Sequence, residues 1–100
     1  MQPLFIAGPC VIENMELLET VAEKLVSINK RLSTEIIFKA SFDKANRTSI
    51  RSFRGPGLEK GLTMLNDIKT KYGLRILTDI HESWQAQPVG EVVDVIQIPA

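Results

Sequence analysis

The residues best suited to chemistry are concentrated between Lys39 and Arg54. This segment holds five cations and one anion, a local net charge of +4 in a chain whose formal net charge is zero. Small hydroxyl and amide side chains, among them Ser41, Asn46 and Thr48, are interleaved with the charges. Guanidinium and ammonium groups pair well with phosphates and carboxylates, so the segment indicates a site for small anionic molecules. A solvated basic loop is the alternative interpretation.

Three residues outside this segment are further candidates. Cys10, the only cysteine, follows Gly8-Pro9, which must break a strand. Three interpretations of Cys10 are open: a small hydrophobic residue buried in the core, a nucleophile, or one ligand of a divalent metal. His81, the only histidine, is expected to make one loop hydrogen bond. Asp79 either orients a ligand, a lysine or water at a strand end, or caps the helix that follows.

The elements that must position these residues can be read from the apolar pattern. Apolar runs predict four strands, at residues 4–7, 36–38, 76–79 and 92–98. Apolar residues at three- and four-residue spacings predict a helix that Asn14 caps and another over about residues 58–72 that Gly73 ends. A short helix near residues 82–83 is expected to be disturbed by Pro88, and Met64 and Trp84 are expected to pack.

Alternating strands and helices with continuously apolar strands predict a parallel α/β sheet. An open sheet and the first half of a (β/α)8 barrel both fit this pattern, and a last strand with no helix after it favours the half-barrel. In either architecture, sites lie at the carboxyl ends of the strands. We therefore expect one mouth to gather the strand-end residues Cys10, Lys39, Ser41, Asp79, Gln97, Pro99 and Ala100.

Length and composition exclude several classes of protein. One hundred residues make at most one domain, and 44% hydrophobic with 24% charged residues is ordinary globular composition. The zero net charge argues against a nucleic-acid binder, and we expect no nucleic-acid partner. No apolar run is long enough to cross a membrane and no secretory signal is visible, so we expect no membrane partner. A single cysteine fits a reducing cytoplasm.

Several segments taken together resemble the family of 3-deoxy-D-manno-octulosonate 8-phosphate synthases. They occur in order over essentially the whole chain, at residues 6–10, 38–49, 53–57, 77–82 and 97–100. The most specific is Lys44-Ala45-Asn46-Arg47-Thr48-Ser49. The related 3-deoxy-heptulosonate 7-phosphate synthases carry Lys-Pro-Arg-Thr there, so Asn46 favours the octulosonate family.

The resemblance implies a fold and an activity. The fold is a (β/α)8 TIM barrel, with residues 1–100 as the N-terminal part of a single domain covering about the first half. The activity is a transferase reaction of lipopolysaccharide biosynthesis, in which phosphoenolpyruvate condenses with D-arabinose 5-phosphate and inorganic phosphate is released. The resemblance also implies a cytoplasmic homotetramer.

The resemblance further implies roles for individual residues. Lys39, Ser41 and Lys44 match positions that hold phosphoenolpyruvate, and Lys44 also faces the aldehyde sugar. Asn46 matches a sugar-hydroxyl contact, whereas Arg47 and Thr48 match the pair that binds the sugar phosphate. Lys44, Asn46 and Asp79 are the candidate catalytic residues. The remaining strand-end residues that line the site are Gln97, Pro99 and Ala100.

A divalent metal is implied by the same comparison. Cys10 matches the metal ligand of the metal-dependent class, which suits Zn, Fe or Mn. The other ligands of the family, a His, a Glu and an Asp, belong to the second half of the barrel, and His81 is not one of them. We therefore expect the 100-residue chain alone to be inactive.

Two other functions remain open from the sequence. One is a synthase on the same scaffold that uses erythrose 4-phosphate. The other is a non-catalytic half-barrel that binds a phosphorylated ligand or assembles with another half.

Overall fold

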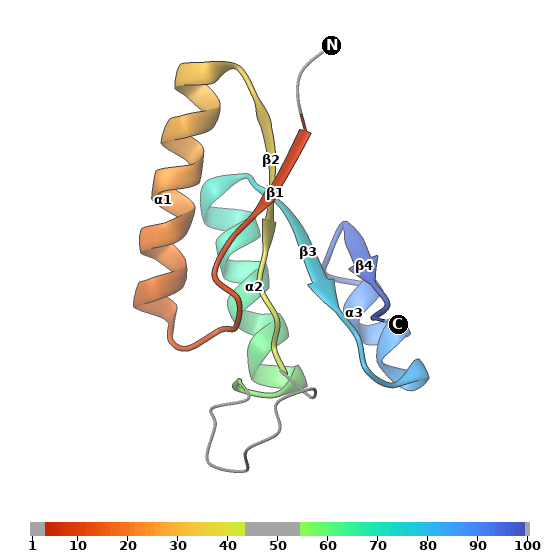
Figure 1. The fold of residues 1–100 in the computed structure, drawn as a ribbon. Coiled ribbons are helices and arrows are strands. Elements are labelled where there is room, and N and C mark those ends of the chain that lie inside the picture. Colours follow the sequence, from red (N-terminus) through yellow and green to blue (C-terminus); the bar gives the residue numbers. More distant parts are fainter. Residues whose placement is uncertain (1–3, 44–54, 100) are drawn as a thin grey trace.

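The chain forms a parallel β-sheet with helices, seen in a computed structural model that describes residues 4–43 and 55–99 (Figure 1). The elements in chain order are β1 (Leu4–Ala7), α1 (Met15–Leu32), β2 (Glu35–Lys39), α2 (Leu58–Tyr72), β3 (Arg75–Asp79), the 3-10 turn η1 (Ser83–Gln85), α3 (Ala86–Gly90) and β4 (Val95–Gln97). The predicted alternation of strands and helices is confirmed.

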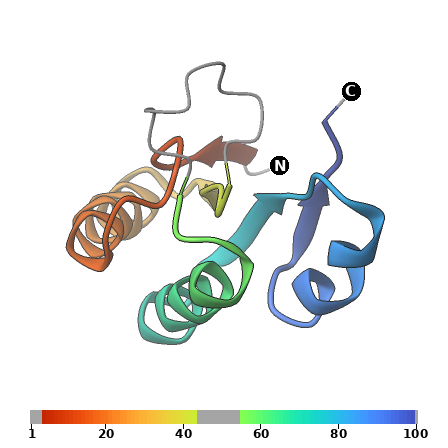
Figure 2. The same ribbon diagram turned by 90° about the horizontal axis from the view of Figure 1, so that it is seen from below.

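The four strands follow one another across the sheet in chain order, β1-β2-β3-β4, and each pair is parallel. Figure 2 shows α1, α2 and α3 together on one side of the sheet. An open doubly wound sheet reverses its strand order and carries helices on both faces. Winding in one direction with all described helices on one face is instead how a (β/α)8 barrel is built.

The two long helices begin and end at the residues that the sequence indicates. Asn14 caps α1, because its Oδ1 accepts a hydrogen bond of 2.8 Å from the amide of Leu17. The helix ends at Ser33, which adopts a left-handed conformation with φ 50°. Gly73 ends α2 at φ 67°, and its amide donates to the carbonyl of Lys69 over 3.0 Å.

The predicted limits of the fourth strand were wrong, since β4 covers only residues 95–97. The amides of Val92 and Val93 both donate to the carbonyl of Val89, so these two valines form a turn after α3. Val93 is nevertheless buried, which is why its apolar side chain resembled part of a strand. Pro88 lies in the first turn of α3, where a missing amide hydrogen is tolerated. The predicted short helix is therefore a 3-10 turn followed by α3.

The core lies between the sheet and the helices. Ile36, Phe38 and Ala40 of the second strand and its extension pack there, together with Ile76 and Ile80 from the third. The helices supply the other side of the core, notably Leu18, Ala22, Leu25, Leu65 and Ile68. Met64 packs against this cluster as predicted. Trp84 does not, because it is 62% exposed.

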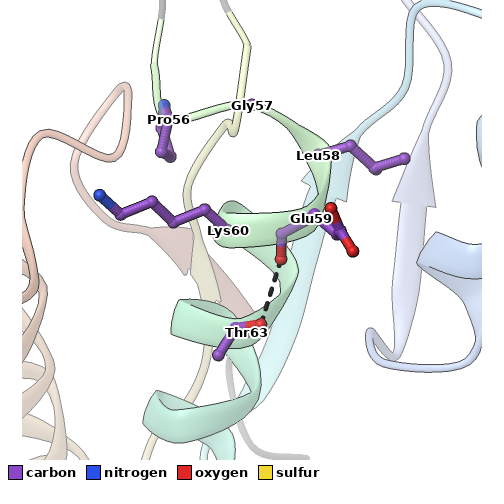
Figure 3. A pocket seen from close by; sticks show the side chains of 6 residues that line it. All are labelled: Pro56, Gly57, Leu58, Glu59, Lys60 and Thr63. Carbon is purple, nitrogen blue, oxygen red and sulfur yellow. Dashed lines mark hydrogen bonds between the residues drawn. The ribbon is translucent and has the colours of Figure 1, made fainter.

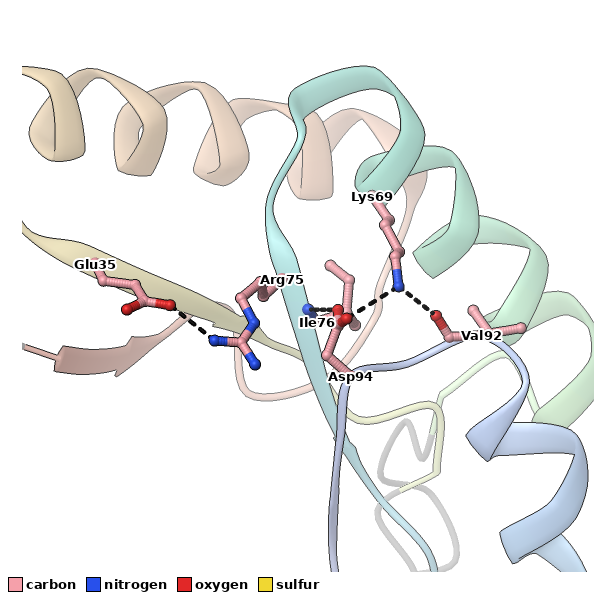
Figure 4. A network of polar contacts seen from close by, with 6 residues as sticks. All are labelled: Glu35, Lys69, Arg75, Ile76, Val92 and Asp94. Carbon is pink, nitrogen blue, oxygen red and sulfur yellow. Dashed lines mark hydrogen bonds and ion pairs between the residues drawn. The ribbon is translucent and has the colours of Figure 1, made fainter.

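A polar network joins α2 to the amino-terminal ends of β3 and β4 (Figure 4). Asp94 accepts a hydrogen bond of 2.8 Å from the amide of Ile76, and Lys69 Nζ lies 3.2 Å from Asp94 Oδ1 and from the Val92 carbonyl. Burial alone would raise the pKa of Asp94, but the Ile76 amide and the Lys69 ammonium outweigh it and lower this pKa. The network therefore fixes the turn from which β4 starts.

Among the described residues, no helix is long and apolar enough to span a bilayer.

Candidate active site

The strand register brings predicted site residues onto one level at the carboxyl end of the sheet. Asp79 and Gln97 are direct partners across β3 and β4. Lys39 pairs with Leu77, which precedes Asp79 by two residues in β3. Ser41 continues β2 by two residues, to the level of Asp79. Side chains alternate along a strand. Since Phe38, Ala40 and Ile76 pack with the helices, Lys39, Ser41 and Asp79 point to the opposite face of the sheet.

The end of β1 is held tightly against the end of β2. A Cβ atom on Gly8 would lie 2.0 Å from the carbonyl oxygen of Lys39, so only glycine fits at this contact. Beyond it, the Ser41 amide donates to the Cys10 carbonyl over 3.3 Å, and the Ile12 amide donates to the Ser41 carbonyl over 2.9 Å. Cys10 therefore lies beside Ser41 with an exposed thiol, and its interpretation as a buried hydrophobe is wrong.

Two polar atoms at this mouth are buried without a hydrogen-bond partner among the described residues. They are Ser41 Oγ, in a residue that is 1% exposed, and Asp79 Oδ1, in a residue that is 7% exposed. Leaving such an atom unsatisfied costs about 1–3 kcal/mol. Native proteins rarely leave such atoms unpaired, and functional sites account for many of the exceptions. This pair therefore indicates where a ligand hydroxyl or water would be bound.

The imidazole of His81 joins the ends of two strands. Its Nε2 lies 2.7 Å from the carbonyl oxygen of Asp43 and 3.2 Å from Asp79 Oδ2. The expectation of a single hydrogen bond for His81 was thus too low. The interpretation of Asp79 as a helix cap was wrong, because Glu82 is the N-cap of η1. Residues two apart at a strand end share a face, so the Asp79-x-His81 spacing could have predicted this contact.

The turn before α2 is hydrogen-bonded to the residues that follow β2. The Gly57 amide donates to the Phe42 carbonyl over 3.1 Å, which ties the residues before position 44 to those after position 54. Gly55 and Gly57 have φ values of 123° and 93°, and Gly57 is the N-cap of α2. These glycines therefore form the turn that leads into α2.

Figure 3 shows a shallow pocket around this turn, lined by Pro56, Gly57, Leu58, Glu59, Lys60 and Thr63. None of these residues is a predicted strand-end residue. The Thr63 hydroxyl donates to the Glu59 carbonyl within the helix. The pocket is therefore separate from the row of Lys39, Ser41 and Asp79.

Several predicted residues lie outside the described part of the chain. They are Lys44, Asn46, Arg47, Thr48 and Ala100. Gln97 and Pro99 are described, and both are exposed at the end of β4.

The described residues do not make a metal centre by themselves. No group of three or more His, Cys, Asp or Glu residues within positions 4–43 and 55–99 could hold a metal ion. A catalytic metal needs about three protein ligands. The exposed thiol of Cys10 can supply one ligand, so further donors would have to come from elsewhere.

A parallel sheet wound in one direction is the first half of a (β/α)8 barrel, and its polar side chains lie at the carboxyl ends of the strands, where barrel enzymes carry their sites. Residues 1–100 match the DAHP synthetase I family, and the chain belongs to this family.

Curated relatives agree with the predicted resemblance. The chain is 62% identical over 97 residues to the 2-dehydro-3-deoxyphosphooctonate aldolase of Campylobacter jejuni (strain RM1221), covering 97% of the chain and 36% of the relative. The proteins of the same name from Helicobacter pylori (strain P12) and Fusobacterium nucleatum are 57% and 56% identical over 99 and 97 residues. These alignments cover 99% and 97% of the chain, and 36% and 35% of the respective relatives. The chain thus spans about a third of the length of the curated relatives that it matches.

Proposed function

We propose that the complete protein containing this chain condenses phosphoenolpyruvate with D-arabinose 5-phosphate to form 3-deoxy-D-manno-octulosonate 8-phosphate and inorganic phosphate. The observation that carries this proposal is 56–62% identity over 97% of the chain to relatives whose name denotes this activity. The row of Lys39, Ser41 and Asp79 at the carboxyl ends of the strands supports it, because barrel enzymes react there.

The charge of the site fits two phosphorylated substrates, one of which also carries a carboxylate. Lys39 lies on the face of the sheet opposite the helices and enters the mouth beside Ser41. We assign these two side chains to phosphoenolpyruvate. Lys44, Arg47 and Thr48, which follow in the sequence, are assigned to the aldehyde sugar and its phosphate, and Asn46 to a sugar hydroxyl. Cations that bring the two anions together also hold the reacting carbons in register.

The reaction forms one carbon–carbon bond and breaks one carbon–oxygen bond. C3 of phosphoenolpyruvate attacks the aldehyde carbon, and the resulting alkoxide takes up a proton. Water adds at C2 and gives up one proton, which balances the proton taken up by the alkoxide. The C2 hydroxyl then gives up its remaining proton to the departing phosphate as the C2–O bond breaks, so inorganic phosphate leaves and C2 becomes a ketone. Asp79 Oδ1, which is buried and has no partner among the described residues, accepts a hydrogen bond from the sugar hydroxyl or the water.

We also propose that Cys10 supplies one thiolate ligand to a divalent metal, Zn, Fe or Mn. Cys10 is exposed in the turn after β1, so its thiol is accessible to a metal ion. Such a metal would act as a Lewis acid toward the aldehyde or the water. Because the described residues lack the other ligands, no step above depends on it.

The family resemblance further supports a cytoplasmic homotetramer that serves lipopolysaccharide biosynthesis. Both properties are part of the proposal, and both rest on membership of the family and not on the geometry of this chain.

The proposal is tested by measuring phosphate release from phosphoenolpyruvate and arabinose 5-phosphate with the complete protein. Asp79→Asn should lower kcat by about tenfold to a hundredfold, because it removes a charged acceptor from the site. The control is Asp67→Asn, which changes an exposed carboxylate on α2 and should leave kcat within about twofold of wild type. Equal rates for the two variants would contradict the role of Asp79, and no release by the wild type would contradict the function.

A further inference from the structure

His81 makes contacts that the proposed reaction has not yet used. Its side chain is 17% exposed and comes from the turn after β3, two residues beyond Asp79. One nitrogen, Nε2, faces both the Asp43 carbonyl oxygen at 2.7 Å and Asp79 Oδ2 at 3.2 Å. Asp43, which follows β2, and Asp79, at the end of β3, therefore both contact the same atom of His81.

The chemistry of these partners fixes where the imidazole carries its proton. The nearer partner is a backbone carbonyl oxygen, which can only accept a hydrogen bond. Nε2 must therefore carry a hydrogen, because an unprotonated nitrogen would direct its lone pair at two oxygens. The shorter distance assigns this hydrogen mainly to Asp43, with Asp79 Oδ2 as the second acceptor.

The backbone of His81 is also held in place. The Oε1 atom of Gln85, a residue that is 6% exposed, accepts hydrogen bonds of 2.8 Å from the His81 amide and 3.1 Å from the Glu82 amide. These part-buried bonds fix the backbone from which the imidazole projects, and turning the ring away would break both Nε2 contacts. This arrangement makes His81 a rigid link and not a mobile loop side chain.

We propose that His81 is a positioning residue that fixes both the Asp79 carboxylate and the point where the basic segment leaves β2. By engaging Oδ2, it leaves Oδ1 of Asp79 turned to the substrates. By engaging the Asp43 carbonyl, it holds the residue that directly precedes Lys44. The inference rests on the proposed function, because its consequence is the placing of the sugar phosphate and of the catalytic carboxylate.

Two substitutions separate this role from simple packing. His81→Gln places an amide N–H at about the reach of Nε2, whereas the shorter His81→Asn places it at about the reach of Nδ1 and cannot make either contact. Both remove the ring, so the loss of ring packing alone would impair both variants. Gln87→Asn is the control, because Gln87 is exposed on α3.

The complete protein is compared in two measurements. Hydrogen–deuterium exchange of the peptide containing Asp43 should match wild type in His81→Gln and be at least severalfold faster in His81→Asn. In steady-state kinetics, His81→Gln should stay within about threefold of wild type, and His81→Asn should lose about tenfold to a hundredfold in kcat/KM, chiefly through the KM for arabinose 5-phosphate.

The outcomes distinguish the inference from the function on which it rests. Equal exchange and equal kinetics in the two His81 variants would overturn the positioning role while the wild type still reacts. Faster exchange in His81→Asn alone, with a wild type that releases no phosphate, would support the link and overturn the proposed reaction.

Discussion

Substituting Gly8 by alanine should destabilise the complete protein through one close contact between the ends of β1 and β2. The new Cβ would lie 2.0 Å from the Lys39 carbonyl oxygen, whereas real Cβ atoms essentially never come closer than 3.0 Å to such an atom. Relief therefore needs a shift of at least 1.0 Å, and both partners are backbone, so no side chain can yield. The ends of β1 and β2 must move apart.

The cost follows from what that shift breaks. Overpacking costs about 1–3 kcal/mol. Two backbone hydrogen bonds join the same strand ends, Ser41 N to Cys10 O and Ile12 N to Ser41 O, and each contributes about 1 kcal/mol. We expect a loss of about 3–5 kcal/mol in the free energy of unfolding. For a domain of roughly 250 residues this lowers Tm by about 10 °C.

Thermal unfolding of the complete protein measures this effect, with Gly90→Ala as the matched control. A Cβ on Gly90 would meet only Ile96 Cδ1, at an ordinary 3.8 Å, so its Tm should change by no more than about 2 °C. If Gly8→Ala shifted Tm no more than Gly90→Ala does, the tight approach of β1 to β2 would be refuted.

Three further predictions follow from the polar network, the thiol and the length of the chain. Because the folded pKa of Asp94 is below its usual 3.8, its stabilisation is present above that pH and is lost as pH falls through the lowered pKa. The stability difference between wild type and Asp94→Asn, measured by urea unfolding, should therefore shrink below about pH 4, and a constant difference would contradict the pairing. Cys10→Asn in the complete protein should lower bound metal severalfold, measured by elemental analysis, and unchanged metal content would contradict the ligand assignment. The 100-residue chain alone should release no phosphate from the two substrates, because its described residues lack a metal-ligand group and it spans 36% of its relatives; ordinary turnover would contradict this.

The fold could be predicted from the sequence wherever the signal is local. The Asn14 cap, the Gly73 terminus and the apolar spacing of α2 depend on neighbouring residues, and all agree with the structure. The limits of β4 could not be predicted, because Val93 is buried in a turn and composition alone does not separate a buried turn from a strand. The prediction that Trp84 packs in the core was wrong for a related reason, since a large apolar side chain need not be buried.

The site was predictable to the extent that strand ends determine it. Placing residues at the ends of parallel strands predicted that Asp79 and Gln97 lie at one mouth, and the register makes them direct partners. The contact of His81 with Asp43 could not be predicted, because this partner is a backbone carbonyl 38 positions away, which has no side-chain signature. Nor could the sequence predict that Ser41 Oγ and Asp79 Oδ1 have no hydrogen-bond partner among the described residues, because this depends on their burial in the folded chain.

Sugar choice by the complete protein tests the central proposal most directly. Phosphoenolpyruvate consumption is measured with arabinose 5-phosphate and, separately, with erythrose 4-phosphate, both at equal concentration. The proposed function predicts rapid consumption with the five-carbon sugar, and a rate lower by at least tenfold with the four-carbon sugar, since Asn46 is assigned to a hydroxyl contact that the shorter sugar makes less well. Equal or faster consumption with erythrose 4-phosphate would contradict the octulosonate assignment, and no consumption with either sugar would contradict the synthase activity altogether.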